Sequence, residues 1–479
     1  MTGPASTPAT WATGTPDSGR MLDEATSLLR RLIRHGCVND GTPDSGQETR
    51  SAALLADYLE GSGLDLEIVE PRPGRGSLIA TLPGTAGPYG GLSLLGHLDV
   101  VPADPAGWTR DPFAADLVDG IVWGRGAVDM LGITATMAVA LKHLAQSGHR
   151  PERDLTLLAV ADEEAGGHWG AGWLAEHRPE LFRDRSVITE SGGFPIPTPD
   201  GTAALECFVG EKGAYPCTLV VQGTSGHGAF PYRTDNAVVK AAEVLRRLSG
   251  LTPAPQLDDT WREYVDGLGH SGDLRRALLD PAAIDEALAA IPLGLARHFH
   301  AVTRMTVSPN TIQGGTKPNV VPDRVDISLD IRVMPGQTRE EVEALLHACL
   351  DGVHGVRPVF GPWRPGSASA RHTPLWDALE RVTSRLAPNG RIVPAISSAA
   401  TDARHVRPAG SVCYGYGLFT DRIASDDYFT MFHGVDERID QGSLRLMCDL
   451  WTGLAHEFTP AAPPAAAATP ALPEKDPDV

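Results

Sequence analysis

The sequence predicts an α/β fold in which one domain is interrupted by a second, smaller domain. Up to about Leu205, short apolar runs alternate with helical patterns, which is typical of a mostly parallel sheet with helices on both faces. Beyond that point, longer strand patterns with fewer helices indicate an α+β domain. The alternation returns at Thr338. We therefore expect the first domain to comprise residues 21–206 and 336–458, and the inserted domain to comprise residues 207–335.

The elements of the first segment follow from periodicity. Leu22–His35 carries apolar residues at helical spacing, and Ile133–Leu144 is a second predicted helix. Leu92–Leu95 is a short apolar run that ends at a glycine, which favours a buried strand. Leu155–Val160 and Val187–Thr189 are strand-like for the same reason.

The inserted segment has its own pattern. It contains predicted strands at Ala214–Val221, Val302–Ile312 and Val325–Arg332, and a predicted helix at Asn236–Leu248. Residues 255–299 are helical in pattern and charged, like an insertion within this domain.

The last segment returns to the first pattern. Thr338 and Glu341 form a capping-box signature before a helix at Val342–Leu350. Thr373 and Pro374 open another helix, with proline near its first position. Two strands and a closing helix complete the domain: Ile392–Ala395, Val412–Tyr414 and Gly442–Phe458.

Composition excludes several classes of protein. The 479 residues are 42% hydrophobic and 21% charged, which is globular rather than disordered composition. The net charge of −19 argues against a nucleic-acid partner, because phosphates require a basic surface. We expect residues 1–20 to be a disordered leader without signal-peptide features, and residues 459–479 to be a disordered Ala/Pro tail.

The cysteine and hydropathy patterns point to a cytoplasmic protein without a membrane partner. The chain has no apolar run of the ~18 residues needed to span a bilayer. Its six cysteines are scattered without a C-x-x-C pair, so neither a disulfide framework nor a cysteine zinc site is indicated. We expect buried thiols in a reducing compartment.

Two motifs with metal-ligand side chains lie at the ends of predicted elements, one after a strand and one before a helix. His97 and Asp99 come just after a buried strand and share one face, so the carboxylate could orient the ring for metal binding; the alternative is a surface loop. Asp129 follows two glycines at a helix start, where it could bridge two metal ions or simply cap the helix.

A third motif places Glu163 and Glu164 at the carboxyl end of a buried strand. Adjacent acids there are costly without a positive partner, and one could bind metal while the other moves a proton. The alternative is a solvated charge cluster. Glu190 and His433 are weak signals alone. Together, five segments offer nitrogen and oxygen ligands without cysteine: His97, Asp129, Glu164, Glu190 and His433. This ligand set suits two Zn²⁺ ions, with Co²⁺ or Mn²⁺ as substitutes.

In their order, these motifs resemble a known family. The segments are GHLDVVP (96–102), WGRGAVDM (123–130), ADEEAGG (161–167), TESGG (189–193) and FHGVDE (432–437). They resemble the co-catalytic zinc hydrolases that include aminoacylase, acetylornithine deacetylase, succinyl-diaminopimelate desuccinylase and glutamate carboxypeptidase. The resemblance covers residues 22–458. It implies a zinc-peptidase-like mixed sheet flanked by helices, with an inserted α+β lid of the kind that often dimerises.

The resemblance also implies roles at the metal site. Glu163 would be the general base, acting on a water that bridges the metals, and Asp99 would orient His97. The two zinc ions would share Asp129 and divide the other ligands between them: His97 and Glu190 for one, Glu164 and His433 for the other.

In the lid, the resemblance implies substrate contacts. His227, in GTSGHGA (223–229), would polarise the substrate carbonyl, and in several relatives this histidine comes from the partner subunit. Asn310 and Arg332 match positions that contact substrate, and a guanidinium fork suits a carboxylate. The alternative for Arg332 is a solvated strand end. A homodimer through the lid is expected.

The predicted function is therefore zinc-dependent hydrolysis of an amide bond in a peptide or N-acyl amino acid, next to a free carboxylate. The alternative is a non-catalytic small-molecule binding protein on the same scaffold. A serine hydrolase is disfavoured, because no G-x-S-x-G elbow stands where a strand meets a helix.

Overall fold

The computed structural model describes residues 11–12, 16–87 and 89–460. Within that part of the chain, no helix has the length and apolar character needed to cross a membrane. The predicted tail lies outside the described residues from 461 onward, and so does most of the predicted leader. Helix α1 begins at Pro16, inside the predicted leader, and Ser18 bonds to Asp449 at 2.6 Å. The prediction of a disordered leader is therefore wrong for its last five residues, 16–20.

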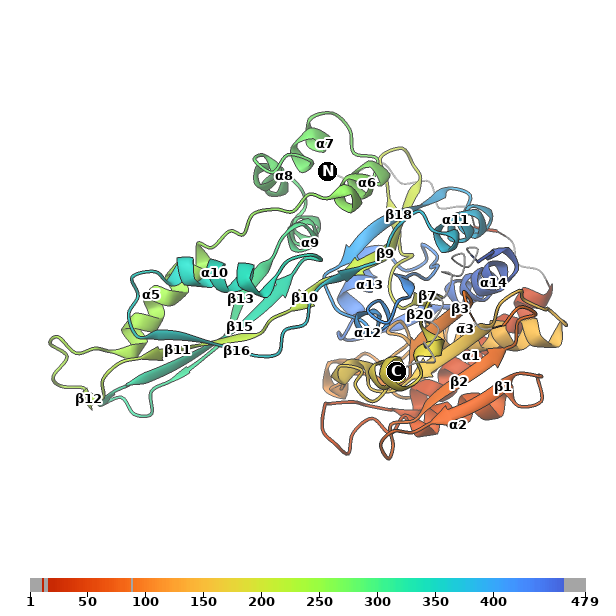
Figure 1. Cartoon of the computed structure of the whole chain (residues 1–479), viewed down its shortest axis with the longest axis horizontal. Coiled ribbons are helices and arrows are strands. Elements are labelled where there is room, and N and C mark those ends of the chain that lie inside the picture. The colour runs from red at the N-terminus through yellow and green to blue at the C-terminus, as the bar shows by residue number, and fades with distance from the viewer. Residues whose placement is uncertain (1–10, 13–15, 88, 461–479) are drawn as a thin grey trace, which may run out of the picture.

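A ten-stranded mixed sheet forms the core of the larger part of the molecule (Figure 1). Strands β6, β3, β7 and β19 run parallel at its centre, so their carboxyl ends meet at one edge. The strands in sheet order are β1 (Asp65–Val69), β2 (Ser77–Leu82), β6 (Leu155–Val160), β3 (Leu92–His97), β7 (Ser186–Thr189), β19 (Val412–Gly415), β9 (Ala203–Glu211) and β17 (Ser367–Ala368), while β18 (Gly390–Ser397) and β8 (Pro195–Pro197) also pair with β9.

Helices cover both faces of this sheet. One face carries the main apolar core, and the other is closed by Leu174 and Val406, which pack against Leu158 and Val187. The helices on the first face are α1 (Pro16–His35), α2 (Thr49–Leu59), α3 (Leu131–Gln146), α11 (Pro374–Leu386) and α14 (Gln441–Glu457), and those on the second are α4 (Ala171–His177) and α12 (Ala403–Val406). The expected α/β architecture with a mixed sheet is confirmed.

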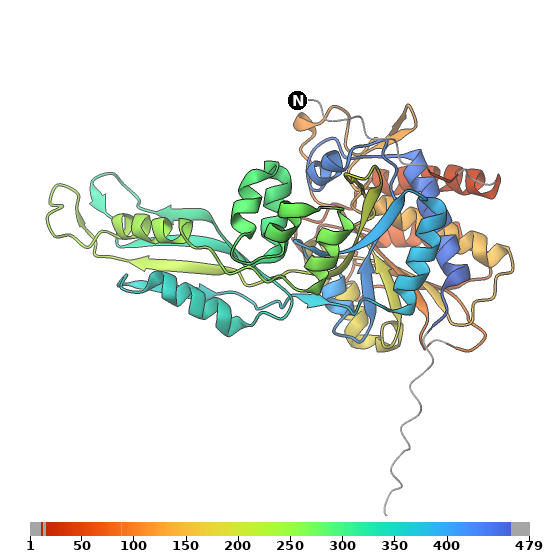
Figure 2. The same ribbon diagram turned by 90° about the horizontal axis from the view of Figure 1, so that it is seen from above.

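A second, antiparallel sheet projects away from the first (Figures 1 and 2). Helices α5 (Ala237–Ser249) and α10 (Arg339–Leu350) pack on it, and Thr338 forms the predicted capping box with Glu341. Its strands are β10 (Gly213–Ala214), β15 (Arg324–Val333), β11 (Cys217–Gln222), β16 (Val356–Phe360) and β13 (Thr306–Gly314), and the pair β12 (Gly226–His227) and β14 (Val320–Val321) lies at its far tip.

Two expectations about this inserted region are wrong. The chain does not return to the main sheet at residue 336, because α10 and β16 still pack in the second core and β17 is the next strand of the main sheet. A capping box predicts where a helix begins, but it does not predict which sheet the helix packs against. The strand expected from Val302 begins at Thr306, because helix α9 continues through Thr303.

Residues 255–299 are helical, as predicted, but they pack elsewhere. Their apolar side chains, among them Trp261 and Phe299, are buried against Ala204 and Val393 of the main sheet. The helices are α6 (Asp259–Gly267), α7 (Gly272–Leu278), α8 (Ile284–Ala290) and α9 (Leu293–Thr303). The insertion thus belongs by packing to the main sheet rather than to the second one.

Smaller elements complete the structure. A three-stranded sheet contains, in order, β20 (Arg438–Asp440), β5 (Ile121–Trp123) and β4 (Asp116–Val118). Helix α13 (Ser425–Met431) comes just before β20 in the chain. Short 3₁₀ turns occupy Pro105–Gly107, Glu163–Ala165 and Pro179–Leu181. All six cysteines, each within the described residues, are free thiols, and five of them are buried.

Candidate active site

The carboxyl edge of the parallel strands brings three of the motif segments together. His97 is the last residue of β3, Glu163 and Glu164 follow β6 in a 3₁₀ turn, and Glu190 follows β7. Because these strands are parallel neighbours, their ends converge on one edge, where open α/β sheets place ligands.

The remaining two segments meet the edge through the small sheet. Strand β5 ends at Trp123 and pairs antiparallel with β20 starting at Arg438, so the loop after β5 and the loop before β20 lie side by side. The first loop carries Asp129, whose peptide bond to Met130 is cis, and the second carries His433.

The two oxygens of Asp129 face two different imidazoles. Its Oδ1 lies 3.2 Å from Nε2 of His97, and its Oδ2 lies 3.4 Å from Nε2 of His433. Each ring has a second carboxylate close by: Glu190 Oε2 is 3.6 Å from His97, and Glu164 Oε2 is 3.2 Å from His433. Asp129 therefore stands between two histidine–glutamate pairs.

The donor set suits divalent cations. One ligand atom each from His97, Asp129 and Glu164 lies within 4.8 Å of the others, and the same holds for His97, Glu163 and Glu190. Among the described residues, Glu164 Oε1 is buried without a hydrogen-bond partner. Nitrogen and carboxylate oxygen are the ligands of hydrolytic zinc and its substitutes.

The electrostatics show how crowded the negative charge is. Burial and the neighbouring Asp129 raise the pKa of Glu190 to about 8, and burial together with Glu190 raises the pKa of Glu163 well above its usual range. Hydrogen bonds to Asp129 and Glu164 raise the pKa of His433 to about 10. Bound cations would relieve this repulsion.

Glu437 holds the loop that carries Asp129, and sequence reasoning missed it as a site residue. Its buried carboxylate accepts from the main-chain N–H groups of Gly126 (2.9 Å), Val128 (2.8 Å) and Asp129 (2.9 Å), and from Arg125 at 2.9 Å. The signal was present in FHGVDE, but its partners are about 310 positions away in the chain.

Asp99 does more than face His97. The ring Nδ1 lies 2.9 Å from the main-chain oxygen of Asp99 and 3.5 Å from its Oδ1. The carboxylate itself accepts from the N–H groups of Glu163 (3.2 Å) and Glu164 (3.0 Å) and from Asn39 at 2.9 Å. The Asp99 carboxylate thus holds the turn that carries the two glutamates. Its predicted role in orienting His97 stays a prediction.

Two arginines that the sequence did not single out as site residues support the acids. Nη2 of Arg404 donates to Oε1 of Glu163 at 3.0 Å and to its main-chain oxygen at 3.1 Å. Arg75 is buried, pairs with Glu48 at 2.6 Å and donates to Asn39 at 3.2 Å. The segment 401–404 matches a family segment near the site, although its role could not be read from the sequence. Arg75 belongs to no motif, because its partners lie on other elements.

This site geometry can be set beside the similarity of the chain to known proteins. The model of peptidase family M20/M25/M40 matches residues 93–457. The chain belongs to this peptidase family. Human aminoacylase-1 is 26% identical over 454 residues, covering 94% of this chain and 97% of that protein. Succinyl-diaminopimelate desuccinylase of Gluconacetobacter diazotrophicus is 35% identical over 238 residues, covering 48% of this chain and 57% of that protein.

Solved structures agree on the fold. The M20 family metallo-carboxypeptidase Sso-CP2 from Sulfolobus solfataricus aligns with a TM-score of 0.68 at 18% identity, covering 91% of this chain and 99% of that one. The YXEP protein of Bacillus subtilis, described as a dinuclear metal binding peptidase, aligns with a TM-score of 0.56 at 15% identity, covering 91% and 98%. The suspected family is confirmed, and this M20 protein is a metallopeptidase or N-acyl-amino-acid amidohydrolase.

A cavity of about 310 Å³ opens over the acidic edge of this M20 protein. One part of its wall is formed by the acids and the histidine described above, another by a serine- and alanine-rich segment, and a third by aromatic rings. The lining residues are Asp129, Glu163, Glu164, Glu190, Ser191, Ser397–Thr401 and His433, together with Phe194, Phe208, His298, Phe429 and Phe432.

The three lid residues predicted to contact substrate do not line this cavity in the described structure. His227 is exposed on β12, at the tip of the second sheet far from the main sheet (Figure 1). Asn310 is exposed on β13 and accepts from Ser308 at 2.7 Å. Arg332, on β15, pairs with Asp330 at 2.8 Å. The substrate-binding roles of these three residues therefore stay predictions.

Proposed function

We propose that this chain hydrolyses an amide bond of a peptide or N-acyl amino acid, next to a free carboxylate, with two zinc ions at the acidic edge. The observation that carries the proposal is the position of Asp129 between two histidine–glutamate pairs. A single buried carboxylate that faces two such pairs suits a bridging ligand of two metals.

The donor chemistry divides into two sites. His97, Asp129 and Glu190 would hold one ion, and Asp129, Glu164 and His433 would hold the other, with Co²⁺ or Mn²⁺ as substitutes for Zn²⁺. When bound, the ions supply a lowered pKa for water and stabilisation of negative charge on a carbonyl oxygen. The unpartnered Oε1 of Glu164 and the crowded carboxylates support the fit.

Glu163 is the proposed general base. It lines the cavity and lies in the same turn as Glu164, and burial together with the nearby Glu190 raises the pKa of its carboxyl group. It would take a proton from the attacking water and pass it to the leaving amine nitrogen. Arg404 fixes one oxygen of its carboxylate, and Asp99 fixes the turn and the ring of His97.

The lid residues require a second copy of the chain. We propose that His227 polarises the substrate carbonyl of the partner's site, with Asn310 and Arg332 binding the rest of the substrate. Exposed apolar side chains on α5, on β13 and in the loop after β12 support a homodimer, since exposed apolar patches mark interfaces. The most exposed are Phe230 (76%), Tyr232 (83%), Val239 (68%) and Ile312 (54%).

One experiment tests the activity. Metal-loaded protein is given a panel of dipeptides and N-acyl amino acids, and its metal content is measured in the same sample. We expect two metal ions per chain and hydrolysis of substrates with a free carboxylate. Two bound ions with no hydrolysis across the panel would instead favour the non-catalytic binding protein.

A second experiment tests the shared site. Glu163→Gln and His227→Ala variants, each inactive alone, are unfolded, mixed and refolded together. If His227 acts across the dimer, mixed dimers contain one intact site and activity returns. Activity that stays absent in the mixture, while refolded wild type regains its own, would contradict a contribution from the partner.

A further inference from the structure

The α6–α9 insertion contributes a side chain to the active-site cavity, which its place in the sequence does not suggest. We propose that this insertion and the aromatic wall beside it form a subsite for a bulky apolar group of the substrate, adjoining the scissile amide. The inference rests on the proposed hydrolase function and names its substrate class.

The insertion is fixed to the main sheet. Trp261 of α6 and Phe299 of α9 are buried in one core with Ala204 of β9 and Val393 of β18. Trp261 also donates its ring N–H to the main-chain oxygen of Leu278 at 2.8 Å, which ties α6 to α7. Helix α9 therefore keeps its position relative to the acidic edge.

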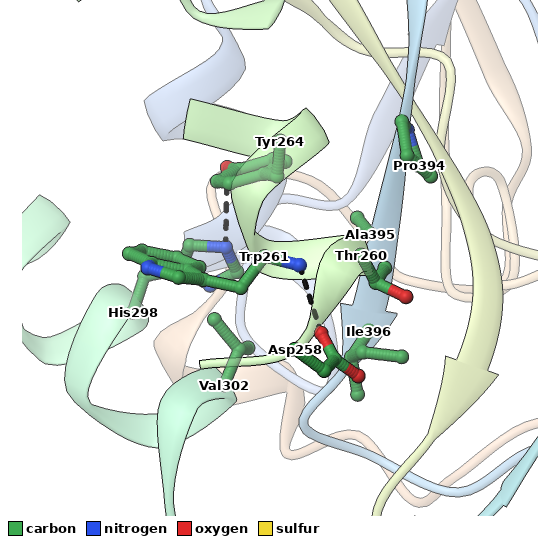
Figure 3. Close-up of a pocket in the computed structure, with 9 residues that line it drawn as sticks. All are labelled: Asp258, Thr260, Trp261, Tyr264, His298, Val302, Pro394, Ala395 and Ile396. Atoms are coloured by element: carbon green, nitrogen blue, oxygen red, sulfur yellow. Dashed lines mark hydrogen bonds between the residues drawn. The ribbon is translucent and has the colours of Figure 1, made fainter. Parts of the chain in front are cut away.

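His298 of α9 is held in place at the cavity. Its Nε2 lies 3.4 Å from Oε1 of Glu206 and 3.4 Å from the hydroxyl of Tyr264. Figure 3 shows the Tyr264 hydroxyl and the His298 ring facing one another. The Tyr264 hydroxyl donates to Glu206 at 2.6 Å, and Glu206 is fully buried on β9. Contacts with the main sheet and with α6 thus set the direction of the ring.

His298 continues an aromatic wall. Its ring centroid is 6.1 Å from that of Phe429, which is 6.0 Å from Phe194. Phe194 in turn packs edge-on against Phe432 at 5.9 Å, and Phe208 completes the lining. Phe429 remains 43% exposed, although it sits beside this cluster. Apolar rings that open into a cavity are typical of the part of a site that buries an apolar ligand group.

The charges of the cavity argue against a negatively charged substrate group in this subsite. Its acids are three predicted metal ligands and the predicted base Glu163, and none of the described residues that line it is a lysine or an arginine. A second carboxylate on the substrate, as in a succinyl group, would find no lysine or arginine to pair with in this wall. An aryl or aliphatic group would bury its surface against the rings instead.

The test compares substrates that differ in one group. Metal-loaded full-length protein is assayed with N-acetyl-alanine, N-acetyl-phenylalanine, N-benzoyl-alanine and N-succinyl-alanine. We expect the better of the two aromatic substrates to exceed N-acetyl-alanine in kcat/KM by about tenfold or more, and N-succinyl-alanine not to do so. Equal values, or a preference for the succinyl compound, would overturn the subsite. No hydrolysis of any of the four would count against the proposed function itself.

Variants locate the preference. His298→Ala removes the insertion's contact and Phe429→Asp puts a charge on the wall, so both should lower the ratio of aromatic to acetyl-alanine kcat/KM several-fold. Neighbouring His300→Ala and Thr430→Asp, neither of which lines the cavity, should keep the wild-type ratio. If His298→Ala does not fold, Phe429→Asp decides alone, because its side chain is already half exposed. An unchanged ratio in the folded wall variants would contradict the proposal.

Discussion

The acidic edge of the main sheet and the tip of the second sheet both carry residues that sequence motifs marked, yet they differ in how those residues are held. At the edge, side chains approach one another within 3.2–3.6 Å, and all of them except the exposed His433 are largely buried. At the tip, His227 is exposed and does not line the cavity over the acidic edge. The ends of parallel strands meet within one chain, whereas the role that we propose for the exposed tip lies at the site of a partner chain.

The largest effect is expected for Glu163→Gln. If the edge is a self-contained catalytic centre, losing the base should lower kcat by about 10²–10⁴-fold while metal content is unchanged. Steady-state kinetics and metal analysis of one sample measure both. Activity near that of wild type would show that Glu163 is not the general base. It would also contradict the proposal that the acidic edge is the catalytic part of the chain.

Glu437→Gln tests whether the edge depends on its supporting hydrogen bonds. All four contacts of this carboxylate are donors, so an amide must turn its NH₂ group toward other N–H groups. We expect a loss of about 10–100-fold in metal affinity, measured by competition with a chelator. The neighbouring Asp436→Asn, which bonds to Thr109 instead, is the matched control and should bind metal normally.

Ile312→Asp tests whether the second sheet is completed by a partner. A charge in the apolar surface of an interface should weaken association about tenfold or more, seen by sedimentation velocity over a range of concentrations. Ile68→Asp, equally apolar and 41% exposed but on an edge strand of the main sheet, is the control. Equal behaviour of the two variants would argue against an interface along β13.

The smallest effect concerns the pH dependence of stability behind the edge. Burial and the nearby Asp99 raise the pKa of Glu48 to about 7 from 4.5. The folded state therefore binds more protons than the unfolded state between these values, so this group's contribution to stability is present below about 4.5 and is lost as pH rises through about 7. Urea unfolding at pH 5 and pH 8 should show a smaller pH-dependent loss in Glu48→Gln than in wild type. An unchanged loss would show that Glu48 is not the group that titrates.

The sequence predicted the residues of the candidate site better than the residues that hold them in place or the packing of the inserted helices. His97 ends one buried strand, and Glu164 and Glu190 follow two others; that local pattern is visible without coordinates. Glu437 and Arg404 act on partners far away in the chain, which no local pattern reveals. The residues that were grouped together at 255–299 show the same limit: helical periodicity marked the helices correctly, but their apolar faces fit the main sheet rather than the second.

The central claim is that Asp129 is shared by two metal ions, and metal stoichiometry tests it most directly. Purified wild type, Asp129→Ala and His433→Ala are equilibrated with the same Zn²⁺ buffer, and bound metal is measured per chain by mass spectrometry. We expect two ions in wild type, one in His433→Ala and none held tightly in Asp129→Ala. Two ions retained by Asp129→Ala, or a single ion in wild type, would contradict it.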